Sequence, residues 1–182
     1  MNNTVSKDIN SNISSVVSEG LCTGCGTCTA LCAKEIIKME LNSQKGTFLP
    51  KINEKYCVNC GICYKVCPGL EVDFEKLNME IFGKKPKDSF IGNYTDCYTG
   101  CSTDKKIRFD ASSGGIITQF LIFALDKKII DGAMVTRMNK NYPLKPEPFI
   151  ARTRQEIVEA SQSKYCPVPV NLALKEILNA PD

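Results

Sequence analysis

The chain has 182 residues, of which 43% are hydrophobic and 24% are charged, and its formal net charge is +3. This composition predicts a packed globular protein of one or two domains. The small net charge and the lack of a basic stripe argue against nucleic acid as a partner. The longest apolar stretch, at residues 116–125, is interrupted by polar residues and is too short to span a membrane.

The N-terminal segment is polar. Residues 1–18 lack the long apolar core that precedes the cleavage site of a secretory signal. They predict a disordered tail and a cytoplasmic protein. The chain also contains eleven cysteines and no histidine. Because the number of thiols is odd and no export signal is seen, disulfide bonds are disfavoured as their role.

Eight of the cysteines form two copies of the spacing C-x2-C-x2-C-x3-C, at residues 22–32 and 57–67. This spacing is typical of bacterial two-cluster ferredoxins, in which the fourth cysteine of each run binds the other cluster. We expect that fourth cysteine to begin a short helix. The sequence therefore predicts two [4Fe-4S] clusters with crossed ligands: Cys22, Cys25, Cys28 and Cys67 for one, and Cys57, Cys60, Cys63 and Cys32 for the other.

Zinc and a purely structural pair of clusters are the alternatives. Zinc sites commonly use two cysteine pairs separated by a longer loop, often with histidine, and the repeat does not match that pattern. A structural cluster pair stays open, although two adjacent clusters suggest a relay of single electrons. Gly24, Gly26 and Gly61 would let the backbone approach the clusters closely. Pro68 fits the ferredoxin pattern, whereas Ala33 departs from it.

Residues 19–80 are predicted to form the ferredoxin domain. Between the two cysteine runs, strands at 36–41 and 47–52 should pair as a hairpin. Residues 81–106 show little periodicity and predict a linker, whose lysine-rich stretch at 84–87 is expected to be solvated.

Residues 107–182 predict a second domain of α/β type, because strands and helices alternate. The fold class of the whole chain is therefore expected to be α+β, a bacterial-type ferredoxin domain followed by an incomplete α/β domain. The predicted elements are a helix at 116–127, strands at 132–138 and 147–153, a helix opened by a capping box at Thr153–Glu156, and a last helix at 170–178.

Ser112, Ser113, Gly114 and Gly115 stand immediately before the predicted helix at 116–127. Bare amides, hydroxyl groups and the positive end of a helix dipole are the components of a phosphate site. On these grounds alone an ordinary helix cap is the simpler explanation. No G-x-G-x-x-G follows a predicted strand, so a Rossmann nucleotide site is not supported.

The order of these motifs resembles that of the beta subunits of coenzyme F420 hydrogenases and dehydrogenases. The resemblance covers about residues 20–182 and rests on the two cysteine runs, then ASSGGIITQFLIFALDKKIIDGAMV, then PFIARTRQEIVEASQSKY. It implies an iron–sulfur flavoprotein in which FAD lies between the clusters and a deazaflavin coenzyme or other substrate. It also places five residues near the flavin: Ser112, Ser113, Gly114, Gly115 and Lys164.

Family members continue beyond the point at which this chain ends. The resemblance therefore implies that residues 107–182 are the N-terminal part of a flavin-binding α/β domain. Three cysteines lie outside the two runs: Cys97, Cys101 and Cys166. We expect them to be small buried thiols, because two ligands do not make a metal site.

The leading functional hypothesis is electron transfer through two [4Fe-4S] clusters by the beta subunit, or a fragment of it, of an FAD-containing oxidoreductase. Its expected partner is a redox protein or catalytic subunit. No side chain is expected to act as a general acid or base. The alternatives are a ferredoxin-like carrier without flavin or catalysis of its own, and an inactive fragment in which the clusters only stabilise the fold.

Overall fold

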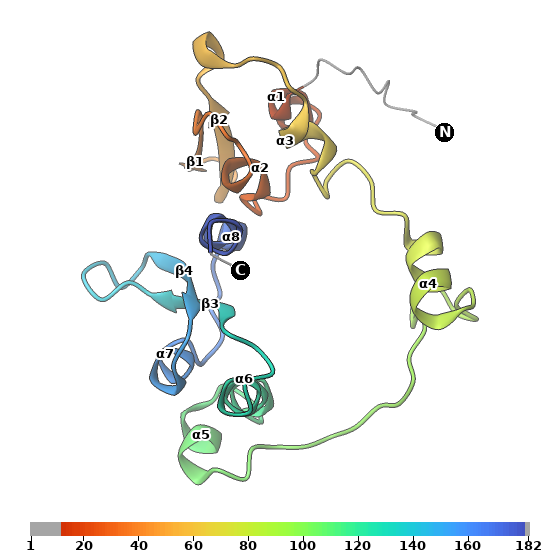
Figure 1. Cartoon of the computed structure of the whole chain (residues 1–182), viewed down its shortest axis with the longest axis vertical. Coiled ribbons are helices and arrows are strands. Elements are labelled where there is room, and N and C mark those ends of the chain that lie inside the picture. Colours follow the sequence, from red (N-terminus) through yellow and green to blue (C-terminus); the bar gives the residue numbers. More distant parts are fainter. Residues whose placement is uncertain (1–11, 181–182) are drawn as a thin grey trace.

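The computed structural model describes residues 12–180 and combines short helices with two two-stranded sheets (Figure 1). The elements fall into two groups. The first contains α1 (Ile13–Ser18), α2 (Thr27–Ala30), β1 (Ile37–Asn42), β2 (Thr47–Ile52), η1 (Glu54–Tyr56) and α3 (Ile62–Lys65). The second contains α5 (Lys105–Asp110), α6 (Ile116–Asp126), β3 (Ala133–Met138), β4 (Pro146–Ala151), α7 (Arg154–Glu159), η2 (Val170–Ala173) and α8 (Leu174–Leu178). This arrangement agrees with the α+β class.

The first sheet is the hairpin that the sequence predicts. β1 and β2 pair antiparallel, from Ile37 opposite Ile52 to Asn42 opposite Thr47. Asn42 closes the turn, because its Oδ1 accepts a hydrogen bond of 2.9 Å from the Lys45 amide. Gly46 then adopts a φ of +63°, which a residue without Cβ reaches at no steric cost. The prediction of this hairpin is confirmed.

The two cysteine runs share one local structure. Gly26 and Gly61 follow the second cysteine of each run with φ of +87° and +73°, and each precedes a one-turn helix, α2 or α3. The third cysteine of each run lies inside the helix. The fourth follows the helix, so the expectation that it begins one was wrong. The reason is that the left-handed glycine sets the chain reversal earlier, directly after the second cysteine.

Helix α1 occupies part of the segment that was expected to be a disordered tail. Its side chains Ile13 and Val16 are 1% and 0% exposed and pack against Ile37, Cys63 and Tyr64. Asn12 caps the helix by accepting a 2.9 Å hydrogen bond from the Ser14 amide. Two apolar residues three positions apart give this short helix a buried face. The prediction of a disordered tail was therefore wrong for residues 12–18. Residues 1–11 lie outside the described part of the chain.

The two groups are joined by a long connection. It contains one helix, α4 (Phe74–Phe82), which has no buried residue and lies apart from both groups in Figure 1. Sequence analysis did not predict this helix, which is capped by Asp73 and ended by Gly83 in the left-handed conformation. Residues 83–104 contain neither helix nor strand, and the predicted linker at 81–106 also includes the last residues of α4 and the first of α5.

The α/β type predicted for residues 107–182 implies a parallel sheet, but the second sheet is antiparallel. β3 and β4 pair antiparallel, from Ala133 opposite Ala151 to Met138 opposite Pro146. The connection at 139–145 is shorter than the dozen or so residues that a parallel crossover needs. The expectation of a parallel sheet was therefore wrong for these two strands. The predicted helix at 116–127 and the capping box of Thr153 and Glu156 are confirmed.

The core of the second group lies where α6 and α7 meet β4. Its fully buried members are Ile122, Ala151 and Ile157, which are at most 2% exposed. Arg137 of β3 adds a polar bridge, because its guanidinium lies 4.3 Å from the centre of the Phe149 ring and 3.4 Å from a carboxylate oxygen of Glu159 in α7. Arg137 thus connects β3 to β4 and to α7, on the face of the strands that also carries the core residues Val135, Phe149 and Ala151.

The C-terminal elements η2 and α8 of the second group contact α2 of the first group, and α8 lies next to the first group in Figure 1. Lys175 of α8 pairs with Glu35 of the first group, and Arg152, just after β4, pairs with Glu176 of α8. Exposed ion pairs of this kind each contribute little free energy. They therefore fix the orientation of α8 but add little to the stability of its contact with the first group. A closer contact is made at Gly26, where an added Cβ would lie 3.3 Å from the Leu172 side chain.

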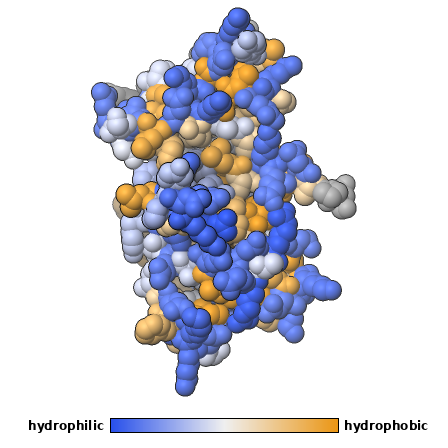
Figure 2. All heavy atoms as spheres, turned by 90° about the vertical axis from the view of Figure 1, so that its left-hand side faces the viewer, coloured by the Kyte–Doolittle hydropathy of each residue, from blue (hydrophilic) through white to orange (hydrophobic). Residues whose placement is uncertain are grey.

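The described part of the chain contains no helix that is both long and apolar enough to cross a membrane. On the face that Figure 2 shows, hydrophobic side chains form separate groups among hydrophilic ones.

We expect Ile122→Ala to lower the free energy of unfolding by about 2–5 kcal/mol, because it removes a fully buried side chain from the second core. Ile117→Ala is the matched control on the same helix, since Ile117 is 72% exposed and should change stability by no more than about 0.5 kcal/mol. Anaerobic chemical unfolding followed by circular dichroism measures both. Equal losses in the two variants would contradict this packing of α6.

Candidate functional site

One cavity collects four cysteines from both runs. Cys22, Cys25 and Cys28 of the first run line it together with Cys67 of the second. Its apolar walls come from Ile13, Met39, Pro50 and Pro68. These are the four residues that sequence analysis assigns to one cluster.

The other four cysteines also lie near one another. The thiol of Cys63 is within electrostatic range of Cys60, Cys32 and Cys57, and Cys32 comes from the first run. The Cys67 thiol, in contrast, interacts with Cys25 and Cys22. Each group of thiols thus contains the fourth cysteine of the other run, which is the juxtaposition that crossed ligation requires. Ligation of iron by these residues stays a prediction.

Burial controls the acidity of the thiols inside this region. It raises the pKa of Cys28 to about 12 and also raises the pKa values of Cys63 and Cys67, and neighbouring thiols add to the effect. Burial also opposes ionisation of Cys25, but hydrogen bonds, chiefly from Thr27, outweigh it and lower the pKa of that thiol. Because the thiolate is the metal ligand, binding of iron must displace protons from most of these sulfurs.

A buried hydroxyl beside the cysteines fits a cluster. Thr29 Oγ1 is buried and has no partner with hydrogen-bond geometry among the described residues, yet it is near enough to the Cys28 sulfur to favour the ionised thiolate. A buried hydroxyl without a partner is costly, and a thiolate or sulfide would accept a hydrogen bond from it. In the described part of the chain no three His, Cys, Asp or Glu side chains are grouped tightly enough to hold a single metal ion. A cubane does not require such a group, because its thiolates bind separate irons.

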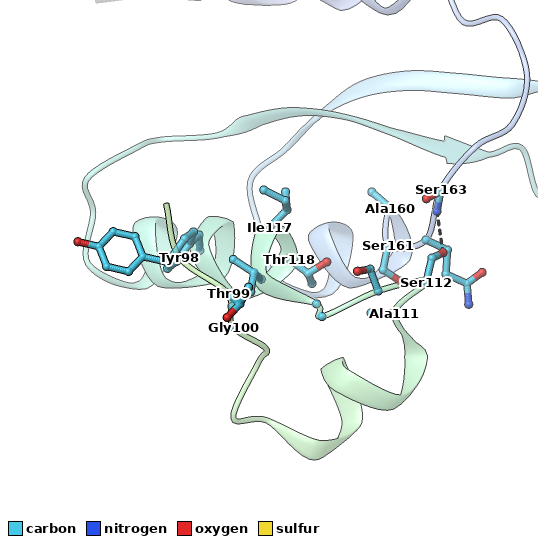
Figure 3. A pocket seen from close by; sticks show the side chains of 16 residues that line it. Tyr98, Thr99, Gly100, Ala111, Ser112, Ile117, Thr118, Ala160, Ser161 and Ser163 are labelled. Atoms are coloured by element: carbon cyan, nitrogen blue, oxygen red, sulfur yellow. Dashed lines mark hydrogen bonds between the residues drawn. The ribbon is translucent and has the colours of Figure 1, made fainter. Parts of the chain in front are cut away.

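A second and larger cavity lies at the start of α6 (Figure 3). Its volume is about 760 Å³, within the range of about 300–1,000 Å³ that is common for ligand sites. Three segments line it: residues 98–100, residues 111–118 with Phe120, and residues 160–163. Ser112 to Gly115, the four residues predicted before the helix, all belong to the second segment. Ser112 Oγ accepts a 3.0 Å hydrogen bond from the Ser163 amide and so joins two walls.

The start of α6 offers free hydrogen-bond donors to this cavity. No side chain caps the helix, and Gly115 takes the N-cap position with φ of +73°, so the first-turn amides keep no side-chain partner. Gly114 lies so close to the wall that an added Cβ would be 2.7 Å from the Gly100 carbonyl oxygen. Backbone amides, hydroxyls and a helix dipole can bind phosphate in such a place. The residues present therefore fit the phosphate end of a dinucleotide.

Lys164 does not line this cavity. Its ammonium group donates hydrogen bonds to the carbonyl oxygens of Ala160, Ser161 and Gln162, at the end of α7. Burial lowers the pKa of Lys164. The structure thus gives this lysine a helix-capping role. Its side chain does not reach the cavity in which sequence analysis predicted a flavin contact.

The wall segments at 98–100 and 160–163 were missed by sequence analysis. Tyr98, Thr99 and Gly100 fall in the predicted linker, where no periodicity marks them. The nearby Cys97 and Cys101 are exposed, and Cys166 is half-buried. The expectation of three buried thiols was therefore wrong. Such short loop segments carry no sequence signal, because the cavity forms only when the chain folds back onto α6.

Two segments of the chain match known protein families. Residues 97–175 match the family described as coenzyme F420 hydrogenase/dehydrogenase, beta subunit N-term, and residues 21–69 match the 4Fe-4S dicluster domain. Residues 97–175 thus carry the N-terminal domain of the coenzyme F420 hydrogenase/dehydrogenase beta subunit family. The N-terminal cysteine runs of the chain are accordingly those of an iron–sulfur protein.

Individual relatives agree with this assignment. The coenzyme F420 hydrogenase subunit beta of Methanosarcina barkeri is 38% identical over 90 residues, which cover 50% of this chain and 31% of that protein. The coenzyme F420-dependent sulfite reductase of Methanocaldococcus jannaschii is 27% identical over 154 residues, 84% of this chain and 21% of that protein. A solved structure of the F420-reducing [NiFe] hydrogenase complex from M. barkeri matches 48% of this chain and 32% of its own, with 34% identity and a TM-score of 0.42. The chain thus spans about a third of the hydrogenase subunit.

Two double variants distinguish crossed from uncrossed ligation. With crossed ligands, Cys22→Ala with Cys67→Ala damages a single cluster and leaves about four irons, whereas Cys60→Ala with Cys67→Ala damages both and leaves fewer. Uncrossed ligation gives the opposite order. Iron analysis and electron paramagnetic resonance of anaerobically reconstituted protein measure the result, and Cys97→Ala should keep about eight irons as the control.

Proposed function

We propose that this chain transfers single electrons through two [4Fe-4S] clusters as part of an FAD-containing oxidoreductase of the coenzyme F420 hydrogenase/dehydrogenase type. The observation that carries the proposal is the gathering of Cys22, Cys25, Cys28 and Cys67 in one cavity. Three of these cysteines come from one run and one from the other, as two interlocked clusters need. The domain limits that we propose are 19–80 for the ferredoxin part, 81–106 for the linker and 107–182 for the flavin-binding part.

The cluster ligands differ in exposure, which suits a relay. Cys28 and Cys63 are buried, whereas Cys60 is exposed. Burial and solvent access are among the factors that set cluster potential. The site of Cys57, Cys60, Cys63 and Cys32 therefore presents an accessible edge through which a redox partner could exchange electrons.

FAD is proposed for the cavity at the start of α6. Ser112, Ser113, Gly114 and Gly115 would hold its phosphates through amides, hydroxyls and the helix dipole. Tyr98 and Phe120, which also line the cavity, are 88% and 62% exposed and offer aromatic faces to a planar ring. A bound flavin would supply the conversion of a hydride pair into single electrons.

The substrate and partner come from the relatives. Both the hydrogenase subunit and the sulfite reductase are named for coenzyme F420, so a deazaflavin is the proposed hydride donor or acceptor. The hydrogenase relative is a subunit of a complex, so a catalytic subunit or other redox protein is the proposed partner. A cytoplasmic location is part of the same proposal.

The proposal is tested by measuring iron and flavin in the same sample. The chain is purified without oxygen, reconstituted with iron, sulfide and excess FAD, and freed of unbound flavin. About eight irons and one tightly bound FAD are expected. Eight irons without FAD would instead support a ferredoxin-like carrier without flavin. Four irons, or zinc, would overturn the two-cluster assignment.

A pair of glycine variants locates the flavin. Gly114→Ala should abolish FAD retention while iron content stays unchanged, because the new Cβ would meet the Gly100 carbonyl oxygen at 2.7 Å. Gly132→Ala is the matched control. Gly132 stands just before β3 and outside the cavity, and its new Cβ would lie almost equally close, at 2.8 Å, to the Ile150 side chain. This substitution should lower thermal stability and leave FAD bound. Flavin loss in both variants, or in neither, would count against this cavity.

A further inference from the structure

The C-terminal segment makes hydrogen bonds to one of the two cysteine runs. The backbone N–H of Asn171 in η2 donates a hydrogen bond of 2.9 Å to the Cys25 carbonyl oxygen. Its side-chain Nδ2 donates to Thr27 Oγ1 at 2.7 Å. Thr27 Oγ1 in turn lies 3.3 Å from Cys25 Sγ. Within residues 12–180 these bonds connect η2 to the first run, across 144 positions of sequence.

The direction of the last bond follows from the chemistry of the ligand. A cysteine that binds iron is a thiolate and carries no proton, so it can only accept. The hydroxyl of Thr27 must then donate to Cys25 Sγ. This orientation is favoured because the Thr27 oxygen already accepts a hydrogen bond from Asn171, which leaves its single proton free to point at the sulfur.

Hydrogen bonds to cluster sulfurs are among the factors that set reduction potential. Reduction adds one electron to the cluster and increases the negative charge on its thiolates. A donor at one thiolate stabilises the reduced state more than the oxidised state, since a charge-assisted hydrogen bond strengthens with charge. Hydrogen bonds in a chain also polarise one another. The hydrogen bond from the side-chain amide of Asn171 to Thr27 should therefore strengthen the hydrogen bond that Thr27 donates to Cys25 Sγ.

The second cysteine run has a different environment. Its Cys57 Sγ lies 3.4 Å from Asn59 Oδ1, an atom that accepts rather than donates. Asn59 is two residues away in the same run and belongs to the loop before Cys60. The two groups of thiols are therefore unequal at these contacts, and in the first group the donor, Thr27, is itself held by Asn171, a residue outside the ferredoxin part.

We propose that Asn171, acting through Thr27, raises the reduction potential of the cluster bound by Cys22, Cys25, Cys28 and Cys67. Asn171 is thus a positioning residue that couples the docking of the C-terminal segment to the energy of one electron carrier. This inference rests on the cluster part of the proposed function and does not depend on FAD.

The test is a mediated anaerobic redox titration of the full chain with both clusters, followed by electron paramagnetic resonance. The electrode supplies the electron for each reduction. Two one-electron waves are expected, and the wave of each cluster is identified with Cys22→Ser and Cys60→Ser. Thr27→Val, which keeps the side-chain shape but removes the hydroxyl, should shift the wave of the first cluster to more negative potential and leave the other unchanged.

Two further variants separate tuning from a merely structural role. Thr27→Ser retains the hydroxyl and should restore the wild-type wave. Asn171→Ala should shift the same wave in the same direction by a smaller amount. Thr136→Val is the matched control, because it removes a threonine hydroxyl in β3, far along the chain from the cysteines, and should move neither wave.

The outcomes are distinct. A wave that does not move in Thr27→Val, in protein with two intact clusters, overturns the inference alone. Equal shifts of both waves also overturn it, since they would report a general loss of packing. A wild-type chain that shows only one cluster overturns the proposed function, and the inference with it.

Discussion

The need to surround each cluster with thiolates from two separate runs is the constraint on which the first part of the structure depends. Because Cys67 must reach the cavity of Cys22 and Cys25, the two runs have to lie side by side, and the hairpin of β1 and β2 spans the distance between them. The buried side chains in this part are few, so its hydrophobic core is small. In small domains a bound metal commonly supplies the missing free energy. The clusters would therefore be structural as well as functional components.

Helix α1 completes that small core. Ile13 and Val16 pack against Cys63 and Tyr64, and Ile13 also lines the cavity of the other thiols. This short helix thus covers Cys63 of one group of cysteines and part of the cavity of the other. Low dielectric around the sulfurs strengthens every hydrogen bond that they accept, so the contribution of Thr27 and Thr29 depends on this apolar cover.

The features that sequence analysis predicted correctly are those set by local chemistry. The hairpin, the helix after Gly115 and the capping box of Thr153 each depend on residues within a few positions of one another. The errors concern features that need distant partners. Helix α1, for example, is stable only because of the core beneath it. The pairing of β3 with β4 is an exception, because the short connection at 139–145 already favours a hairpin.

The candidate site divides in the same way. The cysteines were predicted as cluster ligands from their spacing, because the spacing itself aims three sulfurs at one point. The structure brings four of them into one cavity and the other four near one another, and ligation of iron stays a prediction. The wall at 98–100 and the contact of Asn171 could not be predicted, since they arise from chain segments that meet only after folding. Lys164 shows the converse. A lysine near a predicted phosphate site is an attractive ligand from sequence, but three carbonyl oxygens of the preceding turn already take its donors.

The contacts also form a continuous path from the cavity at the start of α6 to the first cysteine run. Helix α6, which opens the cavity, packs on α7; α7 packs on β3 and β4; β4 contacts η2; and η2 contacts α2 of the first cysteine run. Each step is a packed or hydrogen-bonded interface, and tightly packed interiors resist continuous deformation. The two groups of elements are therefore held in a defined relation through η2. Under the proposed function, the cluster of Cys22, Cys25, Cys28 and Cys67 would lie on the flavin side of the relay, because η2 contacts the first run. The other cluster, with its exposed Cys60, would face the partner.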